Sequence, residues 1–256
     1  MNTALITGAG SGIGAAAAKK LSEREGMRLL LMGRRLEPLL EVKRSLHNSE
    51  RHEAVSMDVS DARGLVSWLS GEVANLTNHP LVAVFANAGI GGPNVFGEDD
   101  RWDDIIRINL TGTYNTLMAC HPYLKRSDGV THALVTSSVL ARFGVPGQTA
   151  YVASKTGLLG LVRSLALEWS PDGVMVNALC PGWVDTEMAR DSIQAMADAE
   201  SMGQLFVSCG VDSLIIDTGV RPERKLKDLA DLMRAPYFPM PRADAKRLSQ
   251  TIEAAV

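Results

Sequence analysis

The chain has 256 residues, 46% of them hydrophobic and 21% charged, with 26 basic against 29 acidic side chains. This length can bury a large core, the net charge of −3 argues against a general nucleic-acid or anionic-membrane surface, and no apolar run approaches the roughly 20 residues of a membrane span. Three cysteines without a C-x-x-C pair and five histidines without H-x-x-x-H spacing favour neither a disulfide framework nor a metal site, so we expect a metal-free cytoplasmic protein.

Short apolar runs alternate with helical patterns along the first 180 residues. Runs at 3–7, 27–32, 54–57, 81–86, 132–136 and 174–179 predict buried strands, and helices are expected near 12–25, 36–48, 61–76, 100–123 and 150–170. Strands that alternate with helices of this length predict a parallel sheet covered on both faces. The predicted fold class is therefore α/β, a three-layer α-β-α doubly wound sheet, in a single domain over residues 1–256.

The first predicted strand leads into a glycine-rich turn, Thr7–Gly14 (TGAGSGIG), and then into an alanine-rich helix. Glycines let the backbone approach a pyrophosphate without a Cβ clash, and the helix presents free N–H groups to the phosphates. The alternative is a turn that binds no ligand, but its place after the first strand favours dinucleotide binding. The residues expected to contact the dinucleotide here are Gly8, Ser11, Gly12, Ile13 and Gly14.

The end of the second predicted strand indicates which dinucleotide is bound. An acidic residue there would hydrogen-bond a ribose 2′-hydroxyl, but the chain carries Arg34 and Arg35 instead. Two guanidinium groups at this place can pair with a 2′-phosphate. The alternative is that both arginines are merely solvated. The missing acid and the two bases together favour NADP(H) over NAD(H).

A tyrosine and a lysine at i,i+4 spacing begin the long apolar helix near 150–170. Tyr151 and Lys155 would share one helix face, where an ammonium would favour the phenolate and lower the pKa of the tyrosine. Ser138 lies thirteen residues before Tyr151, just after a predicted strand, and its hydroxyl could bond a substrate oxygen. Tyr-x-x-x-Lys alone is common by chance, and its alternative is a tyrosine that packs beside a solvated lysine.

Together with further motifs, these residues resemble the short-chain dehydrogenase/reductase family, in its compact single-domain, 3-oxoacyl reductase-like branch. The resemblance covers residues 1 to about 190 and implies a Rossmann-like fold. The motifs that carry it, in order, are the turn at Thr7–Gly14, Asp58-Val59, Asn87-Ala88-Gly89, Asn109 in an INLTG segment, Ser138, Tyr151, Lys155 and the PGWVDT segment at 181–186.

The resemblance implies a catalytic role for four of these residues. Tyr151 would be the general acid/base, and Lys155 would lower its pKa and bind the nicotinamide ribose. Ser138 would orient the substrate oxygen, with Ser137 as an alternative that the thirteen-residue spacing disfavours. Asn109 would hold a water that passes protons from the lysine, although a buried asparagine bonded to backbone is the structural alternative.

The resemblance also implies further cofactor contacts. Asp58 would accept from the adenine amino group, although it could instead cap the next helix, for which Ser60 and Asp61 are better placed. The Val59 backbone would lie beside the adenine. The remaining contacts would be Asn87, Ala88 and Gly89 (alternatively just a tight turn) at the adenosine ribose, and Pro181, Gly182, Val184 and Thr186 around the nicotinamide, with Thr186 near its carboxamide or the pyrophosphate.

Residues 187–256 depart from the family pattern and are expected to form a divergent substrate flap and C-terminal segment. Residues 211–220 are strand-like, and 221–233 loosely resemble the family's late helix. Met188, Met196 and Met202 could form an adaptable apolar lid or ordinary helix core.

The expected activity is NADP(H)-dependent interconversion of a ketone and a secondary alcohol, with a 3-oxoacyl or small cyclic ketone preferred among substrates. A non-catalytic dinucleotide sensor on the same fold, or an epimerase or dehydratase, is the alternative. The expected partners are a small carbonyl or alcohol substrate and further copies of the chain, as a homodimer or homotetramer joined through the apolar helix at 151–169. Neither nucleic acid nor a membrane is expected as a partner.

Overall fold

The computed structural model describes residues 1–127, 129–182, 184, 186, 188, 215–217, 224–232, 234 and 237–239. The chain divides into two units, Met1–Arg190 and Asp191–Val256, each with its own sheet. Within the described ranges, no helix is both long enough and apolar enough to cross a membrane.

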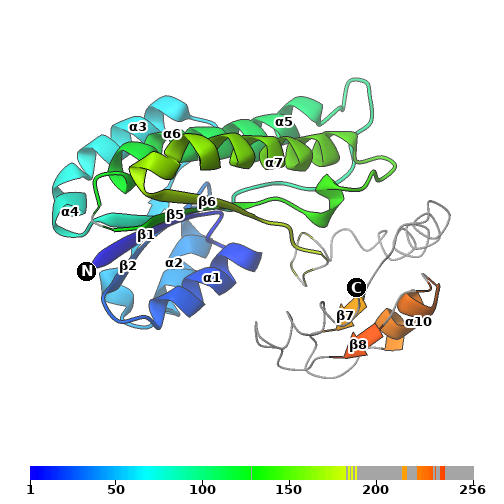
Figure 1. Ribbon diagram of the computed structural model, residues 1–256, viewed down its shortest axis with the longest axis horizontal. Helices are drawn as coiled ribbons and strands as arrows, with labels where there is room; N and C mark the ends of the chain where they lie inside the picture. The colour runs from blue at the N-terminus through cyan, green and yellow to red at the C-terminus, as the bar shows by residue number, and fades with distance from the viewer. Residues whose placement is uncertain are drawn as a thin grey trace. The chain divides into compact units, whose positions relative to one another are not determined.

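The first unit is built on a six-stranded parallel sheet (Figure 1). The strands occur in the order β3-β2-β1-β4-β5-β6, and their bounds are β1 Asn2–Thr7, β2 Met27–Gly33, β3 Glu53–Ser56, β4 Leu81–Ala86, β5 Thr131–Thr136 and β6 Val174–Leu179. Each strand agrees with a predicted apolar run to within about one residue. The strand order reverses between β1 and β4, where ligands bind open α/β sheets.

Helices cover both faces of this sheet, as predicted (Figure 1). Helices α1 (Gly12–Ser22) and α2 (Leu36–Arg44) pack on one face. The other face carries α3 (Ala62–Gly71), α4 (Val73–Asn78), α5 (Trp102–Ile106), α6 (Gly112–Leu124) and α7 (Thr149–Trp169). Two separate apolar clusters, one on each face, form the core, which confirms the three-layer α/β prediction.

Two predicted helices are interrupted. The helix expected at 61–76 divides between α3 and α4 at Glu72, and Asp61 caps α3 by accepting from the Gly64 N–H at 2.9 Å. The helix expected at 100–123 contains a π-helical turn at Arg107–Thr111, which separates α5 from α6. Such turns often occur at functional sites, and this one carries Asn109.

The second unit shows a short β-α-β arrangement in its described residues. Strand β7 (Ile215–Asp217) pairs in parallel with β8 (Tyr237–Pro239), and α10 (Arg224–Leu232) connects them in sequence. Strand β7 lies inside the strand-like run predicted at 211–220. Helix α10 lies inside 221–233, the segment that resembles the family's late helix.

Candidate active site

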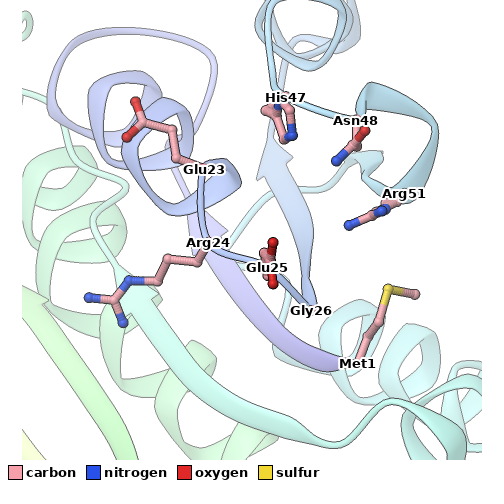
Figure 2. A pocket seen from close by; sticks show the side chains of 8 residues that line it. All are labelled: Met1, Glu23, Arg24, Glu25, Gly26, His47, Asn48 and Arg51. Atoms are coloured by element: carbon pink, nitrogen blue, oxygen red, sulfur yellow. The ribbon is translucent and has the colours of Figure 1, made fainter.

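The predicted site residues of the first unit lie after the carboxyl ends of the parallel strands. Gly8 follows β1, Arg34 follows β2, Asn87 follows β4 and Ser138 follows β5. The carboxyl ends of parallel strands meet at one sheet edge, so the fold brings these positions together. The cavity of about 430 Å³ in Figure 2 lies instead beside Met1 and Gly26, which precede β1 and β2, at the opposite edge.

Two glycines of the turn after β1, Gly8 and Gly14, have no room for a side chain. Gly8 and Gly12 have φ angles of +65° and +52°, which favour glycine. A Cβ on Gly14 would lie 2.3 Å from the Gly8 carbonyl oxygen, so α1 begins in direct contact with the turn. Ser11 is the N-cap of α1, but its side chain makes no capping bond, and the N–H groups of the first helical turn are therefore available to an anion.

Neighbouring strands hold the turn in place. The Thr7 hydroxyl accepts from the N–H groups of both Asn87 and Ala88 at 3.0 Å. The Asn87 amide donates to the carbonyls of Thr7 and Gly8 at 3.2 and 3.4 Å, and its oxygen accepts from the Thr136 hydroxyl at 3.0 Å. Asn87 thus connects β1, β4 and β5, a structural role that the tight-turn alternative did not describe.

Charged groups gather at the ends of β2 and β3. Arg34 and Arg35 are both exposed, and the Arg34 carbonyl accepts from the Ser56 hydroxyl at 3.0 Å. Burial acts to raise the pKa of Asp58, but bonds from the Ser60 N–H and hydroxyl, with positive charge from Arg107 and Arg34, hold that pKa below its usual value. Asp58 is therefore ionised at neutral pH.

The backbone next to Asp58 is tightly packed. Val59 is 5% exposed, and its side chain lies so close to Gly112 that a Cβ there would approach it to 2.5 Å. The Asn115 amide donates to the Val59 carbonyl at 3.2 Å. Packing against α6 thus holds the position at which the adenine contact was expected.

Tyr151, Ser138 and Lys155 converge after β5. Ser138 and Tyr151 share a hydrogen bond, and the Ser138 oxygen also accepts from the Leu140 N–H at 3.1 Å. The Lys155 ammonium lies 5.7 Å from the centre of the Tyr151 ring. Both Ser138 and Lys155 are buried, at 7% and 4% exposure.

The pKa of Tyr151 differs from the sequence expectation. Burial raises it above the ordinary value, and the hydrogen bond with Ser138 acts in the opposite direction. The net lowering of this pKa that the sequence led us to expect is therefore not found, because removing the phenolate from water outweighs the favourable interactions. The phenol is protonated at neutral pH and can act as a proton donor.

Lys155 is fully enclosed beside Thr136. Its ammonium donates to the Thr136 carbonyl at 2.9 Å, and burial lowers the pKa of Lys155 to about 8. A Cβ on Gly89 would lie 3.5 Å from the Lys155 nitrogen and 3.1 Å from the Asn109 amide oxygen, so both groups border the same small space.

Asn109 is completely buried and connects three segments. Its amide oxygen accepts from the Ile90 N–H at 2.8 Å, and its nitrogen donates to the Ile90 carbonyl at 3.0 Å and to the Ser154 hydroxyl at 3.1 Å. The Thr113 hydroxyl donates to the Asn109 carbonyl at 2.7 Å. These bonds match the structural alternative for this asparagine, while leaving it beside Lys155.

Ser137 and Ser138 have different partners. The Ser137 hydroxyl donates to the Lys155 carbonyl at 2.8 Å and is 2% exposed, so it joins β5 to α7. Only Ser138 is bonded to Tyr151 among these two serines. The geometry therefore favours Ser138 over Ser137 as the hydroxyl facing a substrate.

The segment after β6 approaches both ends of the site. The Pro181 carbonyl accepts from the Val139 N–H at 3.0 Å, while Gly182 and Val184 are exposed. A Cβ on Gly12 would lie 3.1 Å from the Thr186 methyl group, so Thr186 lies at the turn where a pyrophosphate is expected.

Met188 lies near Tyr151. A Cβ on Gly91 would lie 3.1 Å from the Met188 sulfur and 3.9 Å from the Tyr151 ring. The other two methionines of the expected lid, Met196 and Met202, lie outside the described residues.

Sequence reasoning gave no role to two threonines that support the site. Thr7 holds the loop after β4 with its hydroxyl, and Thr136 binds Lys155 with its carbonyl and Asn87 with its hydroxyl. Their position as the last residue of β1 and of β5 is the signal that could have identified them.

The residues present fit a dinucleotide. The glycine turn leaves open backbone at the N-terminus of α1. Asp58 and the two arginines supply polar groups at one end of the site, and Tyr151 with Lys155 supplies them at the other end. Among the described residues, no cluster of three histidine, cysteine or acidic side chains could hold a metal ion.

Comparison with known proteins gives the same assignment. Residues 2–197 match the family model described as short chain dehydrogenase. Oxidoreductase UcpA of Salmonella typhimurium is 37% identical over 196 residues, covering 73% of this chain and 71% of that protein. The 3-oxoacyl-[acyl-carrier-protein] reductase FabG of Staphylococcus aureus is 32% identical over 192 residues, covering 73% and 76%.

Solved structures with bound dinucleotides are also similar. Carveol dehydrogenase from Mycobacterium avium in complex with NAD has 30% identity and a TM-score of 0.65, with 70% of each chain covered. A short chain dehydrogenase from Shigella flexneri complexed with NADP has 28% identity and a TM-score of 0.68, with 75% of this chain and 82% of the other covered. The chain therefore belongs to the short-chain dehydrogenase family of NAD(P)-dependent oxidoreductases.

Proposed function

We propose that the enzyme reduces a ketone to a secondary alcohol, or catalyses the reverse reaction, with NADP(H) preferred and Tyr151 as the general acid/base. The observation that carries the proposal is that Tyr151, Ser138 and Lys155 converge at the same edge of the sheet as the glycine turn. The FabG and carveol dehydrogenase relatives support 3-oxoacyl or small cyclic ketones as the substrate class. The dinucleotide would supply or accept the hydride.

Tyr151 and Ser138 would act on the substrate oxygen. The raised pKa keeps the Tyr151 phenol protonated at neutral pH, so it can give a proton to the carbonyl oxygen during reduction. The Ser138 hydroxyl, already bonded to Tyr151, would donate a hydrogen bond to the same oxygen and stabilise its developing charge. In the oxidative direction Tyr151 would accept the alcohol proton.

Lys155 and Asn109 would support this proton transfer. At pH 7 Lys155 remains charged, because its pKa of about 8 lies above that pH, and its positive charge favours a phenolate once Tyr151 has given up its proton. Lys155 would also bind the nicotinamide ribose. Asn109 borders the same space and would keep the proton path positioned through its bonds to Ile90 and Ser154.

A second set of residues would hold the dinucleotide. Gly8, Ser11, Gly12, Ile13 and Gly14 would surround the pyrophosphate, with Thr186 beside them. Asp58 and Val59 would contact the adenine, and Asn87, Ala88 and Gly89 the adenosine ribose. Pro181, Gly182 and Val184 would surround the nicotinamide. The support is their common place at one sheet edge and the close packing of the glycine turn.

A carbonyl panel tests the reaction. We expect oxidation of NADPH to depend on a ketone from the 3-oxoacyl or cyclic class, and Tyr151→Phe to lower turnover by about 10² to 10⁴. NADPH binding by Tyr151→Phe, followed by nicotinamide fluorescence, should remain close to the wild-type value. Turnover that returns the dinucleotide in its original redox state would point instead to an epimerase or dehydratase, and binding without turnover would point to a sensor.

Arg34 and Arg35 carry the expected preference for NADP(H). Both are exposed beside each other at the end of β2, where no carboxylate follows the strand. Arg34→Asp should lower the NADPH-to-NADH preference by about 10- to 100-fold, because a charge-assisted bond to the 2′-phosphate is lost. Arg63→Asp, at an exposed position on α3, controls for the change in net charge. An unchanged preference in Arg34→Asp would contradict the assignment.

We also propose that copies of the chain associate through α7. Leu158, Val162 and Leu165 face the core, while Leu167 is 82% exposed on the same helix. Light scattering on the wild type and on Leu167→Glu tests this arrangement, and an unchanged mass in the variant would contradict it.

A further inference from the structure

The helix that carries Tyr151 begins without a cap of its own. Gln148, the residue before α7, makes no side-chain bond to the helix. The first N–H groups of a helix have no partners within it, so an uncapped first turn frays easily. Tyr151 is the third residue of α7, which places the phenol in this first turn.

Asn94 supplies the missing cap from a distant loop. Its amide oxygen accepts from the Ala150 N–H at 2.9 Å and from the Thr149 hydroxyl at 3.1 Å. The backbone N–H of Asn94 donates to the Gly147 carbonyl at 2.9 Å. Three bonds therefore join Asn94 to the residues that immediately precede Tyr151.

The other half of the Asn94 amide is bonded to Asp100. The Asn94 nitrogen donates to the Asp100 carboxylate at 3.2 Å, and the same carboxylate oxygen accepts from the Trp102 N–H at 3.0 Å, where α5 begins. Helix α5 packs against α7. The amide is thus oriented by one partner on each side, so its oxygen is directed at α7 and not at solvent.

Asn94 and Asn109 attach the same loop to α7 on either side of Tyr151. Asn109 binds both backbone groups of Ile90 and the Ser154 hydroxyl, which in turn donates to the Tyr151 carbonyl at 2.7 Å. Asn94 binds Ala150, one residue before the tyrosine. Fixed on both sides, the first turn of α7 holds the phenol against Ser138.

We propose that Asn94 is a positioning residue for catalysis, which caps α7 through space and so fixes the Tyr151 hydroxyl relative to Ser138. This inference rests on the proposed function, since it gives Tyr151 the role of acid/base. A displacement of about 1 Å at a reacting group can lower turnover by about 100-fold, so a cap this close to the phenol affects rate more than affinity.

Three variants test the proposal. Asn94→Ala removes the cap. Asn94→Asp combined with Asp100→Asn restores the bonds to α7, because an oxygen at position 94 still faces the Ala150 N–H while the new amide at position 100 donates to the other oxygen. The Trp102 N–H, which shares one Asp100 oxygen with Asn94, loses that acceptor in the double variant. Asn75→Ala is the matched control: Asn75 is an exposed asparagine whose side-chain amide donates to the Glu72 carboxylate. Thermal unfolding checks that each variant is folded, with a loss of about 2–4 °C expected for a missing cap.

The first measurement is kinetic, with the ketone found in the carbonyl panel. Asn94→Ala should lower kcat by at least about tenfold while its affinity for NADPH stays within about twofold of wild type. The double variant should recover kcat to within about threefold of wild type, and Asn75→Ala should match wild type. A kcat in Asn94→Ala no lower than in Asn75→Ala, or an equal loss of NADPH affinity, would overturn the proposal.

The second measurement needs no substrate. The chain has four tyrosines, so ¹³C labelling of the ring carbon that bears the hydroxyl, Cζ, gives four resonances, and the Tyr151 signal is the one lost in Tyr151→Phe. Burial raises the pKa of Tyr151 in the wild type, and fraying in Asn94→Ala should return it toward the ordinary value. An unmoved titration in Asn94→Ala would overturn the proposal even if no ketone in the panel is reduced, an outcome that counts against the proposed function alone.

Discussion

Replacing Lys155 by methionine should reveal how much stability the enzyme gives up to keep this ammonium beside Tyr151. Methionine is similar in length and carries no charge. Burial lowers the pKa of Lys155 from 10.5 to about 8 in the folded protein. At about 1.4 kcal/mol for each pKa unit, the lowering from 10.5 to about 8 corresponds to a burial cost of about 3.5 kcal/mol while the lysine stays protonated.

The cost depends on pH in a defined direction. Below pH 8 the lysine is protonated in both the folded and unfolded states, so the full cost is present. Between pH 8 and pH 10.5 the unfolded chain binds more protons than the folded protein, so wild-type stability rises with pH, and above that range the cost is gone. Relative to Lys155→Met, the wild type should therefore gain about 2–3 kcal/mol between pH 7 and pH 10.

Urea unfolding of both proteins at pH 7, 8, 9 and 10 measures this difference. Effects of titrating groups distant from Lys155 occur in both proteins and cancel in the comparison. The lost bond to Thr136 adds an offset at low pH without producing the rise. Lys125→Met, which replaces an exposed lysine at the end of α6, controls for the loss of one charge. A stability difference that is constant from pH 7 to pH 10 would refute the reasoning.

The remaining predictions concern the turn and the two serines. Gly14→Ala should destabilise the protein by about 1–3 kcal/mol and weaken NADPH binding, because its Cβ would lie 2.3 Å from the Gly8 oxygen. At Gly71 an added Cβ would meet no atom within 4 Å outside its chain neighbours and its own helix backbone, so Gly71→Ala should stabilise α3 by about 0.5–1 kcal/mol. Equal effects of the two substitutions on the free energy of unfolding in urea would contradict this account. Ser137→Ala should cost about 1 kcal/mol of stability with kcat nearly unchanged. Ser138→Ala should instead lower kcat by about 10²–10³. If steady-state kinetics showed a larger loss of kcat in Ser137→Ala than in Ser138→Ala, Ser137 would be the serine that faces the substrate.

Most of the sheet could be predicted from sequence because parallel strands covered on both faces are continuous apolar runs. The run at 81–86 coincides with β4, and the one at 174–179 coincides with β6. The interruptions of the helices were harder to predict from the sequence. The residues of the π-helical turn at Arg107–Thr111 keep a helical pattern in the sequence, while the contacts of the turn are with distant segments: Asn109 bonds Ile90 and Ser154.

The site could be predicted where short motifs fix the local geometry. It could not be predicted where burial sets a pKa or where residues far apart in the sequence come into contact. The i,i+4 spacing correctly placed Lys155 near Tyr151, but the direction of the Tyr151 pKa depends on enclosure by the folded chain. Asn94 carries no motif, since the helix start that it caps lies 56 residues later in the sequence. Capping by a neighbouring residue, as at Asp61, is the kind that sequence can identify.

The bonds that shape the glycine turn come from Thr7, the last residue of β1, and from Asn87, which directly follows β4. The turn's conformation is therefore established during folding, and a dinucleotide need not pay for ordering it again. Association should then proceed as a single bimolecular step whose rate rises linearly with NADPH concentration and is limited by encounter and orientation. Differences in affinity among variants of this turn should appear in the dissociation rate, which makes residence time the sensitive quantity for comparing them.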